Sequence, residues 1–278
     1  MDRLAITHPM GESAEISVGR QVVSWASTLI LTPADPFAPF DPADPFREYR
    51  AGIDAVRIRA YPGAFSEVDF VFRPTSSPDG DQLTALVRGK TNWRGWDVAA
   101  WGGGVLYDDA AGAVSAVGAL AGWAVRTEVS IRDDGVGAVL RGTVGIDRRV
   151  ALDGRDLYVI LEYQRDGFGA ADSGDLPRTA QSSAFQRGEL QLFARDALAT
   201  QASYQIHPLW AADLLALVSL SDGSVLLSGG ATWAFGPNSS LRGGFFVGFG
   251  DDALGLTAIG SEFGLTPTVP YLSLTHFF

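Results

Sequence analysis

The end of the chain is the most restrictive feature of this sequence, because Thr268–Phe278 alternates between two kinds of side chain up to its last residue. One face carries Leu272, Leu274 and Phe278, and the other carries Tyr271, Ser273, Thr275 and Phe277. A period of two is the pattern of a half-buried β-strand. Because soluble domains usually end in a frayed polar tail, a terminal Phe-Phe predicts a strand with an apolar surface to rest on.

The same alternation recurs along most of the chain, between turn signals such as Asp222-Gly223 and Pro237-Asn238 that favour hairpins. We therefore expect about fourteen strands, with a further short one at Arg3–His8. The predicted strands are Glu15–Trp25, Gly52–Tyr61, Phe65–Arg73, Gln82–Arg94, Trp96–Tyr107, Ala113–Ala121, Trp123–Arg132, Val136–Asp147, Asp156–Arg165, Glu189–His207, Leu209–Ser221, Ser224–Phe235, Leu241–Gly250 and the terminal segment.

The long connections between these strands are not evenly distributed between the two ends of the strands. The longest, at 26–50, 166–187 and 251–265, all fall on one side, and the connections at 62–64, 95, 122, 148–155, 207–208 and 236–239 fall on the other. Transmembrane β-barrels have short periplasmic turns and longer external loops. We therefore predict an all-β fold, an antiparallel up-and-down transmembrane β-barrel formed by residues 1–278 as one domain. A soluble β-sandwich is the alternative.

Charged side chains gather on the faces opposite the apolar ones. A cation at the middle of the lipid face of a barrel costs about 2–4 kcal/mol, so these residues are expected to face an aqueous lumen. Arg57, Arg59, Arg88 and Lys90 form the densest cationic group, which favours an anionic solute. Paired ladders that hold a plugged barrel together are the alternative. The predicted pore-lining residues are Arg57, Arg59, Glu67, Asp69, Arg73, Arg88, Lys90, Arg94, Arg126, Glu128, Arg132, Arg141 and Glu162.

Aromatic residues lie next to the predicted periplasmic turns, whereas a soluble sandwich would scatter them through its core. Amphipathic rings at the level of the lipid headgroups form the girdle of a membrane barrel. The predicted interface aromatics are Tyr61, Phe65, Trp93, Trp96, Trp123, Trp210, Trp233 and Phe278.

Composition and motifs argue against several other functions. The net charge of −11 gives no basic stripe for nucleic acid, and the absence of Cys removes disulfides and thiolate metal sites. Hydrolase elbows, zinc-protease motifs and phosphate loops are missing from the sequence. We expect no enzyme activity, cofactor or metal, with a hidden Ser203–His207 pair as the alternative. The loop 26–50 is expected to be external, although an inward constriction or a calcium site at Asp35, Asp41 and Asp44 is also considered.

The chain's ending resembles the last strand of Gram-negative outer-membrane β-barrels, except at His276, where that signature usually has an apolar residue. The segment Val18–Trp25, followed by Asp35-Pro36-Phe37 and Gly52–Arg57, is similar to porin-like barrels that include the alginate-export type. The similarity covers residues 1–75 and the last strand.

The resemblance implies a protein of the cell outer membrane, surrounded by lipid and lipopolysaccharide and inserted by the barrel assembly machinery through its C-terminal strand. It implies passage of a small hydrophilic solute or a polysaccharide, by diffusion or export. A non-transport barrel with a structural, adhesive or assembly role through its long loops is the alternative function. Because no signal peptide follows Met1, we also expect a mature form or a fragment that lacks one or more N-terminal strands of a barrel of sixteen or more.

Overall fold

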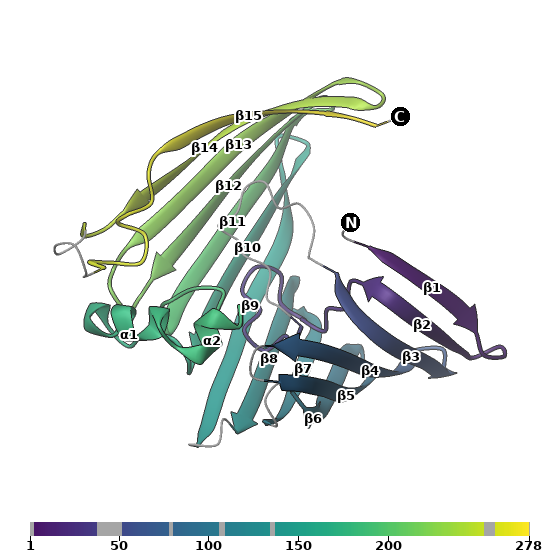
Figure 1. Ribbon diagram of the computed structural model, residues 1–278. Coiled ribbons are helices and arrows are strands. Elements are labelled where there is room, and N and C mark those ends of the chain that lie inside the picture. The colour runs from purple at the N-terminus through teal and green to yellow at the C-terminus, as the bar shows by residue number, and fades with distance from the viewer. Residues whose placement is uncertain are drawn as a thin grey trace.

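A computed structural model of the chain describes residues 3–37, 52–77, 80–105, 109–133, 137–252 and 259–277. They form one antiparallel sheet of 15 strands, in which the spatial order is the order along the chain (Figure 1). This confirms the predicted all-β, up-and-down topology. The strands are β1 Leu4–Pro9, β2 Ala14–Gln21, β3 Ile53–Gly63, β4 Ser66–Ser77, β5 Gly80–Trp93, β6 Trp96–Gly104, β7 Ala110–Leu120, β8 Trp123–Asp133, β9 Ala138–Leu152, β10 Arg155–Asp166, β11 Asp196–His207, β12 Trp210–Ser219, β13 Val225–Gly236, β14 Ser239–Phe249 and β15 Val269–His276.

The sheet curls like the wall of a barrel but is not closed. Among the described residues β1 pairs only with β2 and β15 only with β14, so these strands are the two edges that Figure 1 shows. The curl follows from the right-handed twist that every strand passes to its neighbour. The expectation of additional N-terminal strands stays a prediction.

The two ends of the sheet differ as the sequence predicts. At the end called here the turn side, β5–β6, β7–β8 and β9–β10 are joined by Arg94-Gly95, Ala121-Gly122 and Asp153-Gly154. All six residues have positive φ, between 51° and 82°, as in the type I′ turns whose twist matches that of the flanking strands. The predicted connection at 148–155 is wrong in extent, because β9 continues to Leu152 and pairs with β10 throughout.

The opposite end, called here the loop side, carries the three long connections. Residues 167–195 contain a 3₁₀ turn at Ser173–Asp175 and two short helices, α1 Leu176–Ala180 and α2 Ser183–Gln186, which the sequence analysis did not predict. As a result β11 begins at Asp196, seven residues after the predicted start at Glu189. None of the described helices is both long enough and apolar enough to cross a membrane.

The two faces of the sheet alternate in chemistry. Phe70, Leu161 and Phe245 are 38%, 46% and 42% exposed on the outward face, whereas Asp69 and Glu162 are buried on the inner face. The predicted orientation, apolar side chains outside and charges inside, is therefore confirmed. A sheet that exposes apolar side chains on its outward face and carries charges on its inner face has the surface of a membrane barrel rather than of a soluble sandwich.

Buried apolar residues occur mainly on the inner face, in two clusters within the described part of the chain. Residues 22–37 contribute to both, so this segment joins them across the sheet. The first cluster contains Ile30, Leu31, Ile160, Leu192, Ala194, Ala197, Ala199, Leu217, Leu226, Phe246 and Phe263. The second contains Val23, Trp25, Phe37, Ile53, Ala55, Val71, Leu86 and Val105.

Candidate functional site

The segment 22–37, called here the inner segment, leaves the sheet after β2 and folds onto its inner face. The backbone N–H groups of Ser27 and Thr28 donate to the Glu128 carboxylate at 2.6 and 3.4 Å. The next three N–H groups along the chain donate to Glu162 at 2.6, 2.9 and 2.7 Å. Five consecutive donors thus meet two wall carboxylates, so the expectation of a plain external loop is wrong for residues 26–37.

The composition of the inner segment explains why it turns inward. Trp25, Leu31 and Phe37 are almost completely buried, and transferring such side chains out of water is strongly favourable. The indole N–H of Trp25 donates to Asp69 at 2.8 Å, so its polar atom is satisfied inside. The Gln191 side chain fastens the far end, accepting from the Thr32 N–H at 2.6 Å and donating to a carbonyl at 2.8 Å.

The calcium alternative involves Asp35, Asp41 and Asp44. Asp35 accepts from the Ser24 hydroxyl at 2.7 Å and from the Phe37 N–H at 3.1 Å, which are contacts of a capped turn. Asp41 and Asp44 lie outside the described residues. No cluster of three or more metal-ligating side chains occurs in the part of the chain that the structure describes.

Several inner-face arginines are held by carboxylates on neighbouring strands. Arg57 on β3 forms a two-pronged contact with Asp69 on β4, with Nη2–Oδ2 at 2.6 Å. Arg126 on β8 contacts Asp147 on β9 at 2.6 Å, and the Tyr158 hydroxyl donates to the same carboxylate at 2.8 Å. Such charge-assisted, two-pronged pairs fix side-chain geometry as well as neutralise charge.

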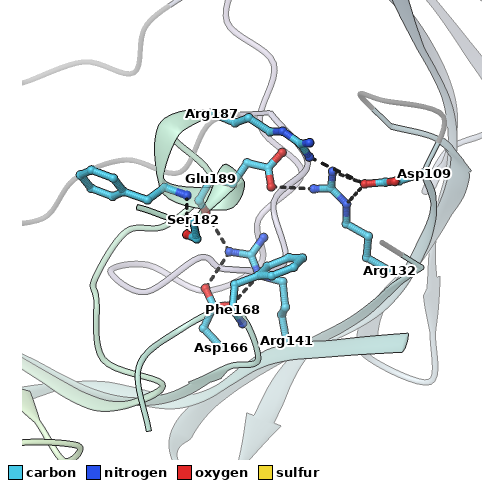
Figure 2. Close-up of polar contacts among 9 residues, drawn as sticks. Asp109, Arg132, Arg141, Asp166, Phe168, Ser182, Arg187 and Glu189 are labelled. Carbon is cyan, nitrogen blue, oxygen red and sulfur yellow. Dashed lines mark hydrogen bonds and ion pairs between the residues drawn. The ribbon is translucent and has the colours of Figure 1, made fainter. Parts of the chain in front are cut away.

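A larger network joins the wall to the connection 167–195 (Figure 2). Arg141 contacts Asp166 through two bonds of 2.8 and 2.7 Å, and Figure 2 shows the Phe168 ring beside its guanidinium. Arg132 binds Asp109 at 2.6 Å and Glu189 at 2.7 Å. The network therefore fastens the loop-side connections to β8, β9 and β10.

Two of the predicted cations on the inner face have no carboxylate partner. Arg73 on β4 and Arg88 on β5 make no ion pair with any residue that the structure describes. Arg73 faces a cavity of about 90 Å³ between residues 33–36 of the inner segment and the wall. Four arginines, two carboxylates and several small or polar residues line it: Pro33, Ala34, Asp35, Pro36, Arg73, Thr84, Trp101, Val105, Ala111, Ser130, Arg132, Arg141, Arg187, Gly188 and Glu189.

The remaining predicted pore-lining residues are also on the inner face, with one exception. Arg59 pairs with Glu15, and Glu67 lies directly across the ladder from Lys90, whose ammonium is 3.8 Å from Asp97. Arg94 departs from the set, because it stands in the β5–β6 turn and its guanidinium lies over the Trp93 ring. The structure thus brings most of the predicted residues onto one wall, while their role in lining a pore stays a prediction.

The predicted interface aromatics gather at the turn side. Trp210 and Trp233 are cross-strand partners whose rings stack at 5.5 Å, and Trp93 pairs directly with Trp96. Trp123 has the same outward orientation on β8, and Phe65 is exposed in the β3–β4 turn. Tyr61 differs from this group, since its hydroxyl donates to Glu15 at 3.2 Å. Phe278 lies outside the described residues.

Several residues of the site were not among the predicted ones. Asp109, Glu189 and Gln191 lie in connections, where period two says nothing about direction. Asp166 could have been found, because it has the same parity on β10 as Glu162 and lies directly across the ladder from Arg141.

For the alternative of a hidden hydrolase, Ser203 and His207 line one hollow of about 740 Å³ at the turn side. Within the described residues they share no hydrogen bond, and the His207 Nδ1 accepts from the Leu209 N–H at 3.2 Å.

Comparison with known proteins places the fold. No family model matches the chain, and no curated protein matches it. Among solved structures, it is similar to a BenF-like porin from Pseudomonas fluorescens Pf-5, with 12% identity, 86% of this chain and 70% of that chain covered, and a TM-score of 0.50. It is also similar to OccAB1 of Acinetobacter baumannii, with 10% identity, 95% and 73% covered, and a TM-score of 0.55. OccAB4 of the same species is similar as well, with 9% identity, 87% of this chain and 68% of that chain covered, and a TM-score of 0.52. The chain therefore has the fold of outer-membrane porin barrels.

Proposed function

We propose that this chain is a passive channel of the Gram-negative outer membrane that admits small hydrophilic anionic solutes. The observation that carries the proposal is the orientation of the wall, with Phe70 and Leu161 exposed outside and Arg57, Arg73 and Arg88 inside. An apolar outer surface suits hydrocarbon, and a charged inner surface suits water and dissolved ions. The porin-like fold supports the same function. Diffusion has no built-in direction, so one path serves uptake and export.

The proposed preference for anions rests on which charged groups already have partners. Three wall carboxylates near the inner segment and the loop-side network are bound to partners: Asp69 to Arg57 and Trp25, Asp166 to Arg141, and Glu128 to the inner segment. Arg73 has no such carboxylate and faces the cavity. A passing anion can therefore be attracted by guanidinium groups without competing for a formed pair.

Reconstitution in planar lipid bilayers tests the proposal. The expected result is stepwise conductance, with a reversal potential in a KCl gradient on the chloride side of zero. Arg73→Gln and Arg88→Gln together should move the reversal potential toward zero. Arg178→Gln is the matched control, because Arg178 is an exposed arginine on α1, in a connection and not on the wall. Conductance no higher than that of the bare membrane would refute the channel, and a potassium preference would refute its selectivity.

A non-transport barrel is the second candidate, favoured by the two apolar clusters that the inner segment builds on the inner face. Such packing fits a plugged barrel whose long connections, among them 167–195, contact partners outside the cell. In that case bilayers containing the folded chain show no conductance steps.

We also propose lipid and lipopolysaccharide as its surroundings, and the barrel assembly machinery as the receptor of β15. Deleting residues 269–278 should then abolish insertion in cells while leaving expression intact.

A further inference from the structure

We propose that the inner segment, residues 22–37, is a gate at the loop side of the channel, and that Glu128 and Glu162 are the positioning residues that hold it closed. The inference rests on the proposed channel function and adds a moving part to it. While the segment is in place, its N–H groups cover both carboxylates, so neither contacts the solute. Their role is to fix the backbone that obstructs the path.

The contacts of the bend argue for a latch. Residues 27–31 belong to no strand or helix, so their N–H groups have no ladder partner. Both acceptors are ionisable side chains of the wall, one on β8 and one on β10, so the segment bridges the strand between them. Consecutive N–H groups that converge on an anion form a concave binding surface. Bonds to a charged acceptor are stronger than neutral ones, so these two side chains make a large contribution to holding the bend.

The wall does not depend on the segment for its own hydrogen bonds. β7, β8, β9 and β10 pair in unbroken registers beneath it. Release of the segment uncovers two carboxylates, which water solvates well, together with the apolar side chains of Trp25 and Leu31 that the wall buries. The hydroxyls of Ser27 and Ser115 also meet at 2.8 Å, and each can bond to water after separation. The released state therefore keeps an intact sheet, which a gate requires.

A reversible lock tests the gate directly. The chain has no Cys, so Ser27→Cys with Ser115→Cys introduces the only thiols, at positions whose oxygens are 2.8 Å apart. Sulfurs that replace these oxygens meet each other, as a disulfide with its S–S bond of about 2.0 Å requires. In bilayers the oxidised double variant should lose its larger conductance level, and a reductant should restore it. Each single Cys variant, treated in the same way, is the control and should show no change.

The latch has its own measurement, which needs no conductance. In the single variant Ser27→Cys, the rate of labelling by a membrane-impermeant maleimide reports release of the segment. Glu162→Gln in that background should raise the rate, because an amide presents an N–H toward three backbone donors. Glu12→Gln, a change of the same chemistry at an exposed position in the β1–β2 turn, should leave the rate unaltered.

The outcomes separate the two proposals. If the wild type does not conduct but Glu162→Gln accelerates labelling, the channel fails and the latch stands. If the wild type conducts and the oxidised and reduced double variants conduct alike, the gate is overturned and the channel stands. Equal labelling rates in Glu162→Gln and Glu12→Gln overturn the latch, and so does failure of the double variant to form its disulfide.

Discussion

Replacing Arg141 by Met tests whether the loop-side network is a structural brace. The guanidinium holds Asp166 through bonds of 2.8 and 2.7 Å, and the two side chains are only 7% and 1% exposed. Met keeps the length of the apolar stem beside Phe168 but leaves the Asp166 carboxylate buried with no cation. Breaking a buried pair in this way costs about 3–5 kcal/mol. The loss should appear in urea unfolding of vesicle-inserted protein, followed by tryptophan emission.

Two further variants make the measurement decisive. Arg178→Met removes an arginine that is 88% exposed and 3.6 Å from Asp175, so it should cost no more than about 1 kcal/mol. Adding Asp166→Asn to Arg141→Met removes the stranded charge and should recover a large part of the loss, which a double-mutant cycle quantifies. If Arg141→Met costs no more than Arg178→Met, the pair is not a buried brace.

Three other substitutions test the faces of the wall. Phe70→Arg places a cation on the outward face in the middle of β4 and should destabilise the vesicle-inserted chain by about 2–4 kcal/mol; an unchanged unfolding midpoint contradicts the lipid contact. Trp25→Phe loses the 2.8 Å hydrogen bond to Asp69 and should lower the free energy of unfolding by about 1.5–3 kcal/mol in the same assay. An unchanged free energy of unfolding would contradict this hydrogen bond. Gly118→Ala puts a Cβ against the Trp96 ring, so the ring must move and its emission should shift; an identical spectrum contradicts that packing.

The fold was accessible from the sequence because its determinants are local. Period two specifies which side chains of a strand share a face, so the outward positions of Phe70, Leu161 and Phe245 needed no knowledge of the partners. The ends of strands depend on pairing instead. Residues after Asp147 include two arginines and look like a turn, yet Val150 lies across from Leu157 and the ladder continues. Such an extension is decided by the neighbouring strand.

The site could be predicted from the sequence only in part, because its contacts also depend on distant segments of the chain. Glu128 and Glu162 were predicted to face inward, and they do. Their partners are backbone groups a hundred or more residues away, and a loop's path across a sheet leaves no periodic pattern. The usable indication was composition. Leu29–Leu31 and Phe37 make the supposed external loop too apolar to remain in water, which favours burial against some surface.

The inner segment also links the width of the path to its charge. While the segment is in place, Glu128 and Glu162 are covered by N–H groups, and Arg73 is the wall charge without a carboxylate that faces the cavity. Once the segment leaves, two bare carboxylates join the lumen beside Arg126, so the local field shifts toward cations. The larger conductance level of the reduced Ser27→Cys, Ser115→Cys variant should therefore have a reversal potential closer to that of potassium than the smaller level has. Identical reversal potentials for the two levels would show that the two carboxylates stay covered, and that the gate lies elsewhere.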